Sequence, residues 1–362
     1  MTMLSKGSTT KTNHDTYAQR RLLEHLIAET SKVLDPLISA GSSVVLLDYP
    51  NNPNVGDSLI WLGEMAYLRS RGVKIDYVCD VNNYSKSMLK EALGGDSTIL
   101  LQGGGNFGTL WPEVQQFRLQ VLRDFPGATV IQFPQSIHFD DALAIEETAQ
   151  EIRSHGNYTL LVRDCPSFDF ALKHFQCKVI LCPDMAFSIG SIKASPQSKF
   201  DRFILSRTDH EKSTDWLKDF NGIRQCLTVE VKDWLQASWP ERVVWRIERH
   251  TKRLRNFVDP HNKGLLVLWN FQAKLRLNRG KLLLERGRVV ISDRLHVHIL
   301  SILMNKPHVL LDNVSRKVSS LHEAWTRPYQ GVIFVQNPNE ALSAADELDS
   351  RVGRPVREAS NP

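Results

Sequence analysis

The chain has 362 residues, which is too long for one ordinary hydrophobic core and favours two domains. It carries 45 basic and 40 acidic residues, and the net charge of +5 is too small to indicate a nucleic-acid-binding protein. The 5 cysteines lack paired CxxC spacing, so structural disulfides and a zinc site are not expected. The expected location of the protein is the reducing cytoplasm.

The N-terminal half of the chain alternates strand and helix patterns. Residues 1–30 form a polar tail and a first helix, without the apolar core of a signal peptide. Apolar runs predict strands at 43–48, 75–79, 97–102, 128–133, 158–162 and 178–182. Strands separated by helices in this way are typical of a parallel sheet with both faces covered. Residues 31–190 therefore read as one doubly wound, Rossmann-like domain.

The second half repeats the pattern after a polar stretch at 190–198, which is the best candidate for a linker. Further strands are expected in the stretches DRFILS, RVVIS, HVLLD and GVIFVQ. Residues 191–340 then form a second Rossmann-like domain, and 341–362 form a C-terminal helix and tail. The fold class is α/β, with two doubly wound domains that face each other across a ligand-binding cleft.

A basic helical insertion at 239–284 interrupts the second domain. From Glu241 to Arg288 there are 13 Lys and Arg against 4 Asp and Glu, which gives 13 − 4 = +9. Tryptophan and leucine are interleaved with these cations, as an interfacial helix pair on an anionic membrane would require. The plainer interpretation is a solvated helical face over an ordinary core, and we favour it over the membrane-binding interpretation.

Polar residues follow the first and third predicted strands, at the edge where open α/β sheets bind ligands. Asn54 lies in the loop after the first strand, and Asp57 is either the helix N-cap or a catalytic carboxylate. The third strand runs into a glycine-rich loop formed by Gly103, Gly104, Gly105 and Asn106. The loop formally matches GxGxxG, but no acidic residue follows to hold a ribose, which argues against NAD. Its backbone amides can still approach a ligand closely.

The later strands add further candidates. The fourth ends at Gln135 and Ser136, and the fifth ends at Arg163, for which a structural ion pair with Asp164 or Asp184 is expected.

In the second domain, Arg207 and Arg294 follow separate strands and suit a doubly anionic ligand. His296 lies two residues beyond Arg294 on the opening turn of a helix, where it can move protons near neutral pH. His298 and His308 are expected to be packed rather than catalytic.

Five stretches in order, NVGDSLIWLGE, LLQGGGNFG, FPQS, the strand end at Arg207 and ISDRLHVHILSILMNKPHVLLDN, together resemble the polysaccharide pyruvyltransferases. The resemblance runs from about Val44 to Asn313. It implies a fold like that of the B-type glycosyltransferases, with an acceptor side in the first domain and a donor side in the second. It also implies transfer of pyruvate from phosphoenolpyruvate to two sugar hydroxyls, which forms a cyclic ketal.

The resemblance further implies a donor site of Arg207, Arg294, Leu295 and His296, with Asp57 as partner from the first domain. His296 would be the general acid, and Asp57 would orient or deprotonate the acceptor hydroxyl. Asn54, Gly103–Gly105, Asn106, Gln135, Ser136 and Arg163 would contact substrate. No cofactor or metal is expected beyond the phosphoenolpyruvate donor.

The expected partner is a saccharide acceptor, which a lipid diphosphate could carry at the inner face of the cytoplasmic membrane. Nucleic acid is not expected. The main alternative is a B-type glycosyltransferase with a nucleotide-sugar donor, for which Asp312 is a candidate ribose ligand. A non-enzymatic scaffold is a weaker alternative.

Overall fold

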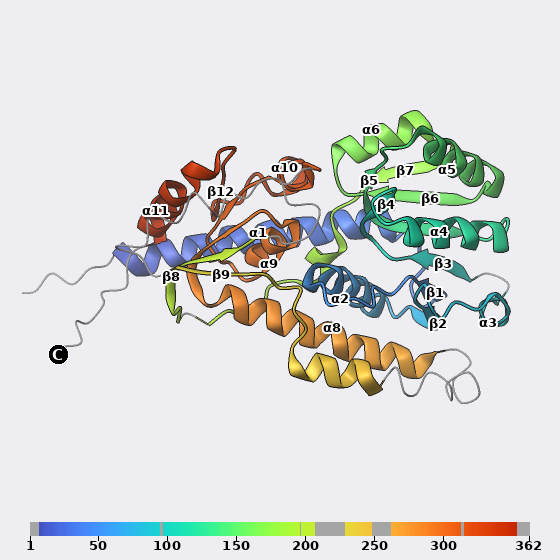
Figure 1. Ribbon diagram of the computed structural model, residues 1–362, viewed down its shortest axis with the longest axis horizontal. Helices are drawn as coiled ribbons and strands as arrows, with labels where there is room; N and C mark the ends of the chain where they lie inside the picture. Colours follow the sequence, from blue (N-terminus) through green and yellow to red (C-terminus); the bar gives the residue numbers. More distant parts are fainter. Residues whose placement is uncertain are drawn as a thin grey trace, which may run out of the picture.

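The computed structural model describes residues 7–94, 97–195, 197–206, 229–247, 262–312 and 315–352, with side chains from Tyr17 onward. Two parallel sheets, each with helices packed around it, occupy opposite ends of the molecule (Figure 1). The predicted α/β class with two Rossmann-like sheets is therefore confirmed.

The first sheet has the strand order β2-β1-β3-β5-β6-β7, and β4 pairs with β5 beyond the end of β3. Its inner strands are buried on both faces, which explains their continuous apolar sequences. The strands are β1 (Ser43–Leu47), β2 (Lys74–Cys79), β3 (Thr98–Leu101), β4 (Gly104–Gly108), β5 (Val130–His138), β6 (Tyr158–Val162) and β7 (Lys178–Leu181). The helices are α2 (Val55–Ser70), α3 (Lys86–Ala92), α4 (Pro112–Asp124), α5 (Ala142–His155) and α6 (Cys165–His174).

The second sheet has the order β12-β11-β10-β8-β9. Its strands are β8 (Phe200–Leu205), β9 (Val229–Lys232), β10 (Gly287–Ser292), β11 (His308–Leu310) and β12 (Val332–Phe334). Around it lie α9 (Leu295–Leu303), α10 (Lys317–Leu321), a π-helical turn η3 (His322–Thr326), a short turn η4 (Pro338–Glu340) and α11 (Ala341–Val352). The edge strand β9 was not predicted, because its four residues, VEVK, carry too short a pattern.

Both sheets reverse their strand order at one point, between β1 and β3 in the first and between β8 and β10 in the second. Open parallel sheets bind ligands at the carboxyl ends of the strands beside such a switch point. The chain crosses from one sheet to the other through η1 (Met185–Ile189) and the polar stretch after it, where the linker was expected.

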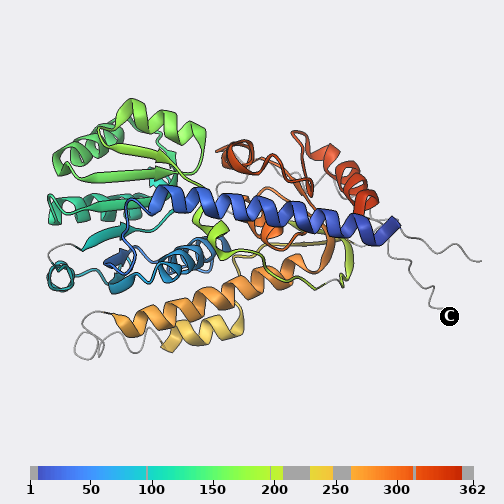
Figure 2. The ribbon, with the colours of Figure 1, turned by 180° about the vertical axis from the view of Figure 1, so that it is seen from behind.

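The first helix, α1 (Gly7–Leu34), is longer than expected and runs along both halves of the molecule (Figure 2). Leu22, Leu23 and Leu26 on this helix are buried in the core between the two sheets. The amide of Gln19 donates to the carbonyl oxygen of Ile302 at 2.8 Å, near the end of α9. The helix therefore ties the two halves together rather than belonging to one.

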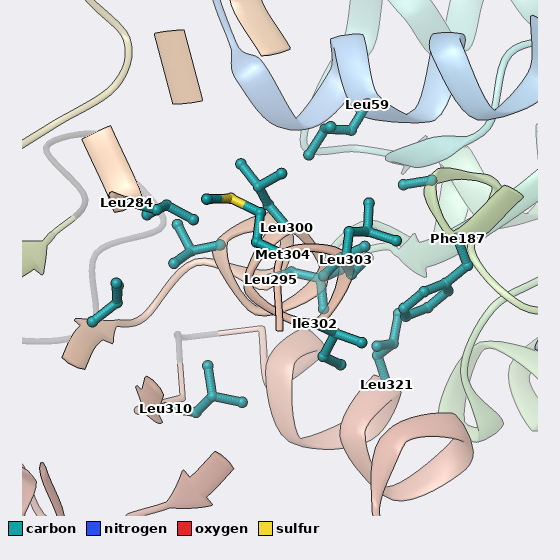
Figure 3. Close-up of a cluster of buried hydrophobic side chains, with 14 of the residues drawn as sticks. Leu59, Phe187, Leu284, Leu295, Leu300, Ile302, Leu303, Met304, Leu310 and Leu321 are labelled. Atoms are coloured by element: carbon teal, nitrogen blue, oxygen red, sulfur yellow. The ribbon is translucent and has the colours of Figure 1, made fainter. Parts of the chain in front are cut away.

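The apolar core at the junction draws on elements from both halves (Figure 3). Leu59 of α2 and Phe187 of η1 meet Leu295, Leu300 and other α9 side chains there. Every residue of α9 except His296 is buried, which explains the unbroken apolar sequence of that helix. The junction fixes the start of α9 close to the start of α2.

The helix α8 (Lys263–Leu284) in the basic insertion packs on the first half of the molecule, against α2 and β2. Trp269 is completely buried and stacks on Tyr49, with ring centroids 4.3 Å apart. Leu265 and Ala273 lie in the same cluster. One side of this helix is thus core, as the plainer interpretation of the insertion required. None of the described helices is both long and apolar enough to cross a membrane.

Candidate active site

A cavity of about 530 Å³ lies where the switch points of the two sheets face each other. The first half contributes residues that follow β1, β2, β3, β4 and β6, and the second half contributes residues that follow β9, β10 and β11. Nine predicted site residues line it: Asn54, Asp57, Gly103, Gly105, Asn106, Arg163, Arg294, Leu295 and His296. Topology alone brings these residues together from positions far apart in the sequence.

The loop before α2 holds Asp57 in place. The N-cap of α2 is Asn54, whose Oδ1 accepts from the backbone N–H of Gly56 at 3.0 Å, so Asp57 is not the cap. Oδ2 of Asp57 accepts from the side-chain amides of Asn52 at 3.0 Å and Asn54 at 3.2 Å. The Asn-rich loop therefore orients a carboxylate on the first turn of α2, facing the cavity.

His296 lies on the first turn of α9 and reaches across to the first half. A Cβ atom added at Gly56 would lie 2.4 Å from Nδ1 of His296, so only glycine at that position leaves room for the ring. Nε2 of His296 is 3.5 Å from Oδ2 of Asp184. The imidazole is thus held between the start of α2 and a buried carboxylate.

Asp184 also receives Nη1 of Arg163 at 2.6 Å, and both side chains are almost completely buried. Burial alone would raise the pKa of Asp184. The charge of Arg163, together with His296 and the N–H of Ala186, holds this pKa far below its usual range instead. Asp184 therefore stays ionised beside His296, and the expected ion pair of Arg163 is confirmed.

The side chain of Arg294 forms an ion pair within the protein. Its Nη2 lies 2.7 and 2.9 Å from the two carboxylate oxygens of Asp233, just after β9. The guanidinium carbon is 5.9 Å from the ring centroid of Trp234. An anionic ligand at Arg294 would have to share this cation with Asp233. The sequence did not predict this pairing, because β9 itself was not predicted.

The glycine-rich segment is partly a strand, since β4 begins at Gly104 and continues the sheet alongside β5. The N–H of Gly103 donates to Oε1 of Glu64 at 2.8 Å. A Cβ atom at Gly105 would lie 2.9 Å from Nη2 of Arg163 and 3.2 Å from Nζ of Lys317. Glycine at position 105 therefore allows two cations to approach the backbone, so the expected open loop is corrected to a short strand at the cavity wall.

Three predicted substrate contacts lie behind this wall instead of in the cavity. Gln135 donates to the carbonyl of Gln102, and Ser136 donates to Asp164 at 2.6 Å. Gly104 faces Ile60. The side chains of Gln135 and Ser136 thus connect the ends of neighbouring strands. Arg207, the remaining predicted donor-site residue, lies outside the described residues.

The two histidines that were expected to be structural are packed. His298 is completely buried, with Nδ1 2.7 Å from Nε2 of His308 and Nε2 2.6 Å from the hydroxyl of Thr326. Burial holds the pKa of His298 well below its usual range and lowers that of His308 to about 4. Both rings are therefore neutral core groups, and this prediction is confirmed.

Comparison with known proteins matches residues 54–315 to the family model for polysaccharide pyruvyl transferases. Pyruvyl transferase 1 of Schizosaccharomyces pombe is 33% identical over 320 residues, 83% of this chain and 74% of that protein. The chain belongs to the polysaccharide pyruvyl transferase family. EpsO of Bacillus subtilis, another protein with pyruvyl transferase in its name, is 26% identical over 86% of this chain and 93% of its own length.

A crystal structure of a functionally uncharacterized protein from Klebsiella pneumoniae superposes with a TM-score of 0.55. It covers 85% of this chain and 99% of that one at 19% sequence identity, so it supports the fold alone. Membership in the family makes the chain a pyruvyltransferase of polysaccharide biosynthesis. The enzyme class expected from the motifs is therefore confirmed.

The structure also reveals cavity residues of this pyruvyl transferase that the sequence did not single out. Asp48 follows β1 with a φ of 69°, in the left-handed region, and is 6% exposed. Burial raises its pKa to about 7, against the opposing charge of Arg118, and the nearby Asp80 and Asp57 raise it too. Position at a strand end was the signal that could have identified Asp48 and Asp80.

Charge is divided across the cavity of the pyruvyl transferase. The lining carboxylates, Asp48, Asp57, Asp80 and Glu113, all come from the first half. Arg294, His296 and Lys317 come from the second half, whereas the lining cation Arg163, which is paired with Asp184, comes from the first. Nζ of Lys317 donates to the carbonyl of Gly105 at 3.1 Å. Trp111 and Tyr49 add aromatic surface on the acidic side. No group of three or more potential ligands among the described residues is arranged to hold a metal ion.

Proposed function

We propose that the protein transfers the carboxyvinyl group of phosphoenolpyruvate to two hydroxyls of a saccharide and releases inorganic phosphate. One proton is added to the methylene carbon, which becomes a methyl group. One hydroxyl attacks C2, the C2–O bond to phosphate breaks, and the second hydroxyl closes the cyclic ketal. The two hydroxyl groups of the saccharide lose one proton each. One of these protons restores the general acid that protonated the carbon, and the other leaves with the phosphate.

The observation that carries this proposal is the position of His296 against Gly56, one residue before Asp57. A proton donor from the second half and a carboxylate from the first half thereby flank one wall of the cavity. His296 acts as general acid toward the methylene carbon, and Asp57 orients or deprotonates the attacking hydroxyl. Oδ2 of Asp184 lies 3.5 Å from Nε2 of His296, where its negative charge attracts a protonated imidazole.

The divided charge supports separate places for the two substrates. Phosphoenolpyruvate carries a carboxylate and a phosphate, which suit the cations of the second half and the N-terminus of α9. Arg294 holds the donor and stabilises the departing phosphate, and Arg207 and Arg163 assist. Carboxylates, asparagine amides and aromatic rings of the first half suit a neutral, hydroxyl-rich acceptor. Asn54, Asn106 and the backbone amide of Gly105 contribute there, whereas the N–H of Gly103 is already donated to Glu64.

The nucleotide-sugar alternative required a carboxylate for the ribose late in the second half. Asp312 was the candidate, but its Oδ1 accepts from the N–H of Ser319 at 3.4 Å and its Oδ2 from the hydroxyl at 2.5 Å. It does not line the cavity. The geometry therefore favours phosphoenolpyruvate over a nucleoside diphosphate as the donor.

The test is a binding and turnover experiment on the purified protein. Phosphoenolpyruvate should raise the thermal unfolding temperature, whereas UDP should not. Incubation with phosphoenolpyruvate and saccharide acceptors should release phosphate and add a pyruvyl group that mass spectrometry detects. Stabilisation by UDP together with no response to phosphoenolpyruvate would overturn the proposal.

A further inference from the structure

The insertion between β9 and β10 exposes side chains of mixed aromatic and basic character. It is formed by the helical segment 239–247 and by α8, which lie side by side at the edge of the molecule (Figures 1 and 2). The helix-pair face consists of Trp239, Arg242, Trp245 and Arg246 on the first helix and Val267, Phe271, Lys274 and Leu282 on α8.

The face concentrates exposed apolar side chains. Of the 11 large hydrophobic residues that are exposed in the described part of the chain, 6 lie between residues 239 and 282. Trp239 is 70% exposed, Val267 is 72% exposed and Phe271 is 52% exposed. On α8 the residues 267, 271, 274, 278 and 282 recur at helical spacing, so they form one stripe opposite the buried Trp269. Clustering of this kind marks an interaction surface.

Within residues 239–247 and 263–284, every exposed charged side chain is positive. Arg242, Arg246, Lys263 and Lys274 are exposed, whereas the acidic Glu241 is buried and lies 3.0 Å from Nε of Arg279. Cations beside tryptophan and phenylalanine on one helical surface match the headgroup and acyl boundary of an anionic bilayer. A protein partner of neutral or basic charge would lack this complementarity.

The inner side of the same helix pair is tied to the cavity. Arg276 donates to the hydroxyl of Tyr49 at 3.2 Å, and Arg279 donates to the carbonyl of Pro53. Arg279 also donates to the carbonyl of Gln236, just before the first helix. Tyr49 and Pro53 both line the cavity. The helix-pair face is therefore connected, through one layer of side chains, to the loop that precedes Asp57.

We propose that the helix-pair face binds the surface of an anionic phospholipid membrane. Trp239, Val267 and Phe271 enter the interface, while Arg242 and Lys274 contact lipid phosphates. Binding in this orientation would place the acceptor side of the cavity close to saccharides carried on membrane lipids, a consequence that rests on the proposed function. The membrane interaction itself does not require turnover.

The test is co-sedimentation of the full chain with vesicles of phosphatidylglycerol, compared with vesicles of phosphatidylcholine. Binding should occur with the anionic vesicles only. It should weaken at least about tenfold between about 0.1 M and about 1 M salt, as the Debye length falls from about 10 Å to about 3 Å. Arg242→Glu with Lys274→Glu should lower the partition coefficient about tenfold or more. Trp239→Ser with Phe271→Ser should lower it through lost apolar insertion.

The matched control is the double variant Leu172→Ser with Lys173→Glu. In the parent protein these two residues are an exposed apolar and an exposed basic side chain on α6, at the opposite edge of the molecule (Figure 1). This control should bind vesicles like the parent, and all variants should keep the same unfolding temperature. Equal binding to neutral vesicles, salt-insensitive binding or an unchanged double charge reversal would overturn the proposal. Reversible self-association that the Trp239 and Phe271 changes abolish would overturn it too, because a second copy would then cover the face.

Discussion

Nε2 of His296 lies 3.5 Å from Oδ2 of Asp184, and the two residues come from different sheets of the molecule. Asp184 caps the turn through which the chain leaves the first sheet, whereas His296 opens the helix after the central strand of the second. The proposed acid is thus oriented by the half of the protein to which it does not belong. Correct assembly of the two halves is a condition for catalysis.

Replacing His296 with Ala should abolish turnover and spare donor binding. Loss of a general acid typically lowers kcat by a factor of about 10² to 10⁴. The dissociation constant of phosphoenolpyruvate, measured by calorimetry, should change only a few-fold. Phosphate release at a near-parental rate would remove His296 from the mechanism, and His298→Gln in the buried pair serves as a control for a structural histidine.

Gly56→Ala should impair turnover without unfolding the protein. The new methyl group would lie 2.4 Å from Nδ1 of His296 and must displace the ring. Alanine is otherwise favoured over glycine in a helix by about 0.5–1 kcal/mol, so helix stability should not fall. We expect kcat to drop more than about tenfold.

The comparison variant is Gly94→Ala, where the nearest atom to a new Cβ would be 3.8 Å away at Ser97. Both variants should show parental unfolding temperatures, and only the first should lose activity. Equal activity of the two would contradict the close contact between α2 and His296.

Asp48→Asn should change how stability depends on pH. Burial raises the folded-state pKa of Asp48 to about 7, well above the usual value of an aspartate, so folding favours the protonated form. Its contribution to the free energy of unfolding is therefore present below about pH 4 and is lost as the pH rises through about 7. The Asn variant, which also tolerates the left-handed backbone, should be more stable than the parent at pH 8 by up to about 4 kcal/mol.

Denaturant unfolding at pH 4 and pH 8 provides the measurement. The difference between variant and parent should nearly vanish at pH 4 and reach its maximum at pH 8. Parallel pH profiles would show that Asp48 ionises normally. Asp169→Asn, at an exposed position on α6, gives the baseline for an ordinary carboxylate.

Asp184→Asn should destabilise the fold at neutral pH. Removing one partner of a buried ion pair leaves Arg163 uncompensated, which typically costs about 3–5 kcal/mol. The pKa of Asp184 is lowered in the folded state, so its stabilisation is present above about pH 4 and is lost as the pH falls further. A loss below 1 kcal/mol at pH 7, measured in urea, would mean that the pair is not structurally important.

Much of the fold followed from local patterns. The strand β1 is a continuous apolar run because both faces of its sheet are covered, and such runs are visible in a sequence. The parallel order placed Asp57 and Gly105 at one edge of the first sheet, because carboxyl ends of parallel strands share an edge. His296 follows a strand end of the second sheet and lines the same cavity. The strand-end positions of these residues were predictable without any knowledge of contacts.

Long-range pairing was not predictable in the same way. Asp233 follows the four-residue strand β9, and nothing local indicates that it pairs with Arg294. The expectation that Gln135 and Ser136 face the substrate rested on strand-end position, but β4 extends the sheet past them and covers both. For α8, the apolar pattern of the sequence did not distinguish the buried Trp269 from the exposed Val267 and Phe271, which lie about half a turn away.

The long first helix has a consequence for how substrates reach the cavity. Leu22, Leu23 and Leu26 are inserted in the seam between the halves, and Gln19 is hydrogen-bonded to the far end of α9. A wide hinge motion between the two halves would have to separate α1 from this apolar core and expose the three leucines to water. Substrate entry and product exit in this enzyme should therefore depend on local movement at the rim, with the two lobes kept at a nearly constant angle.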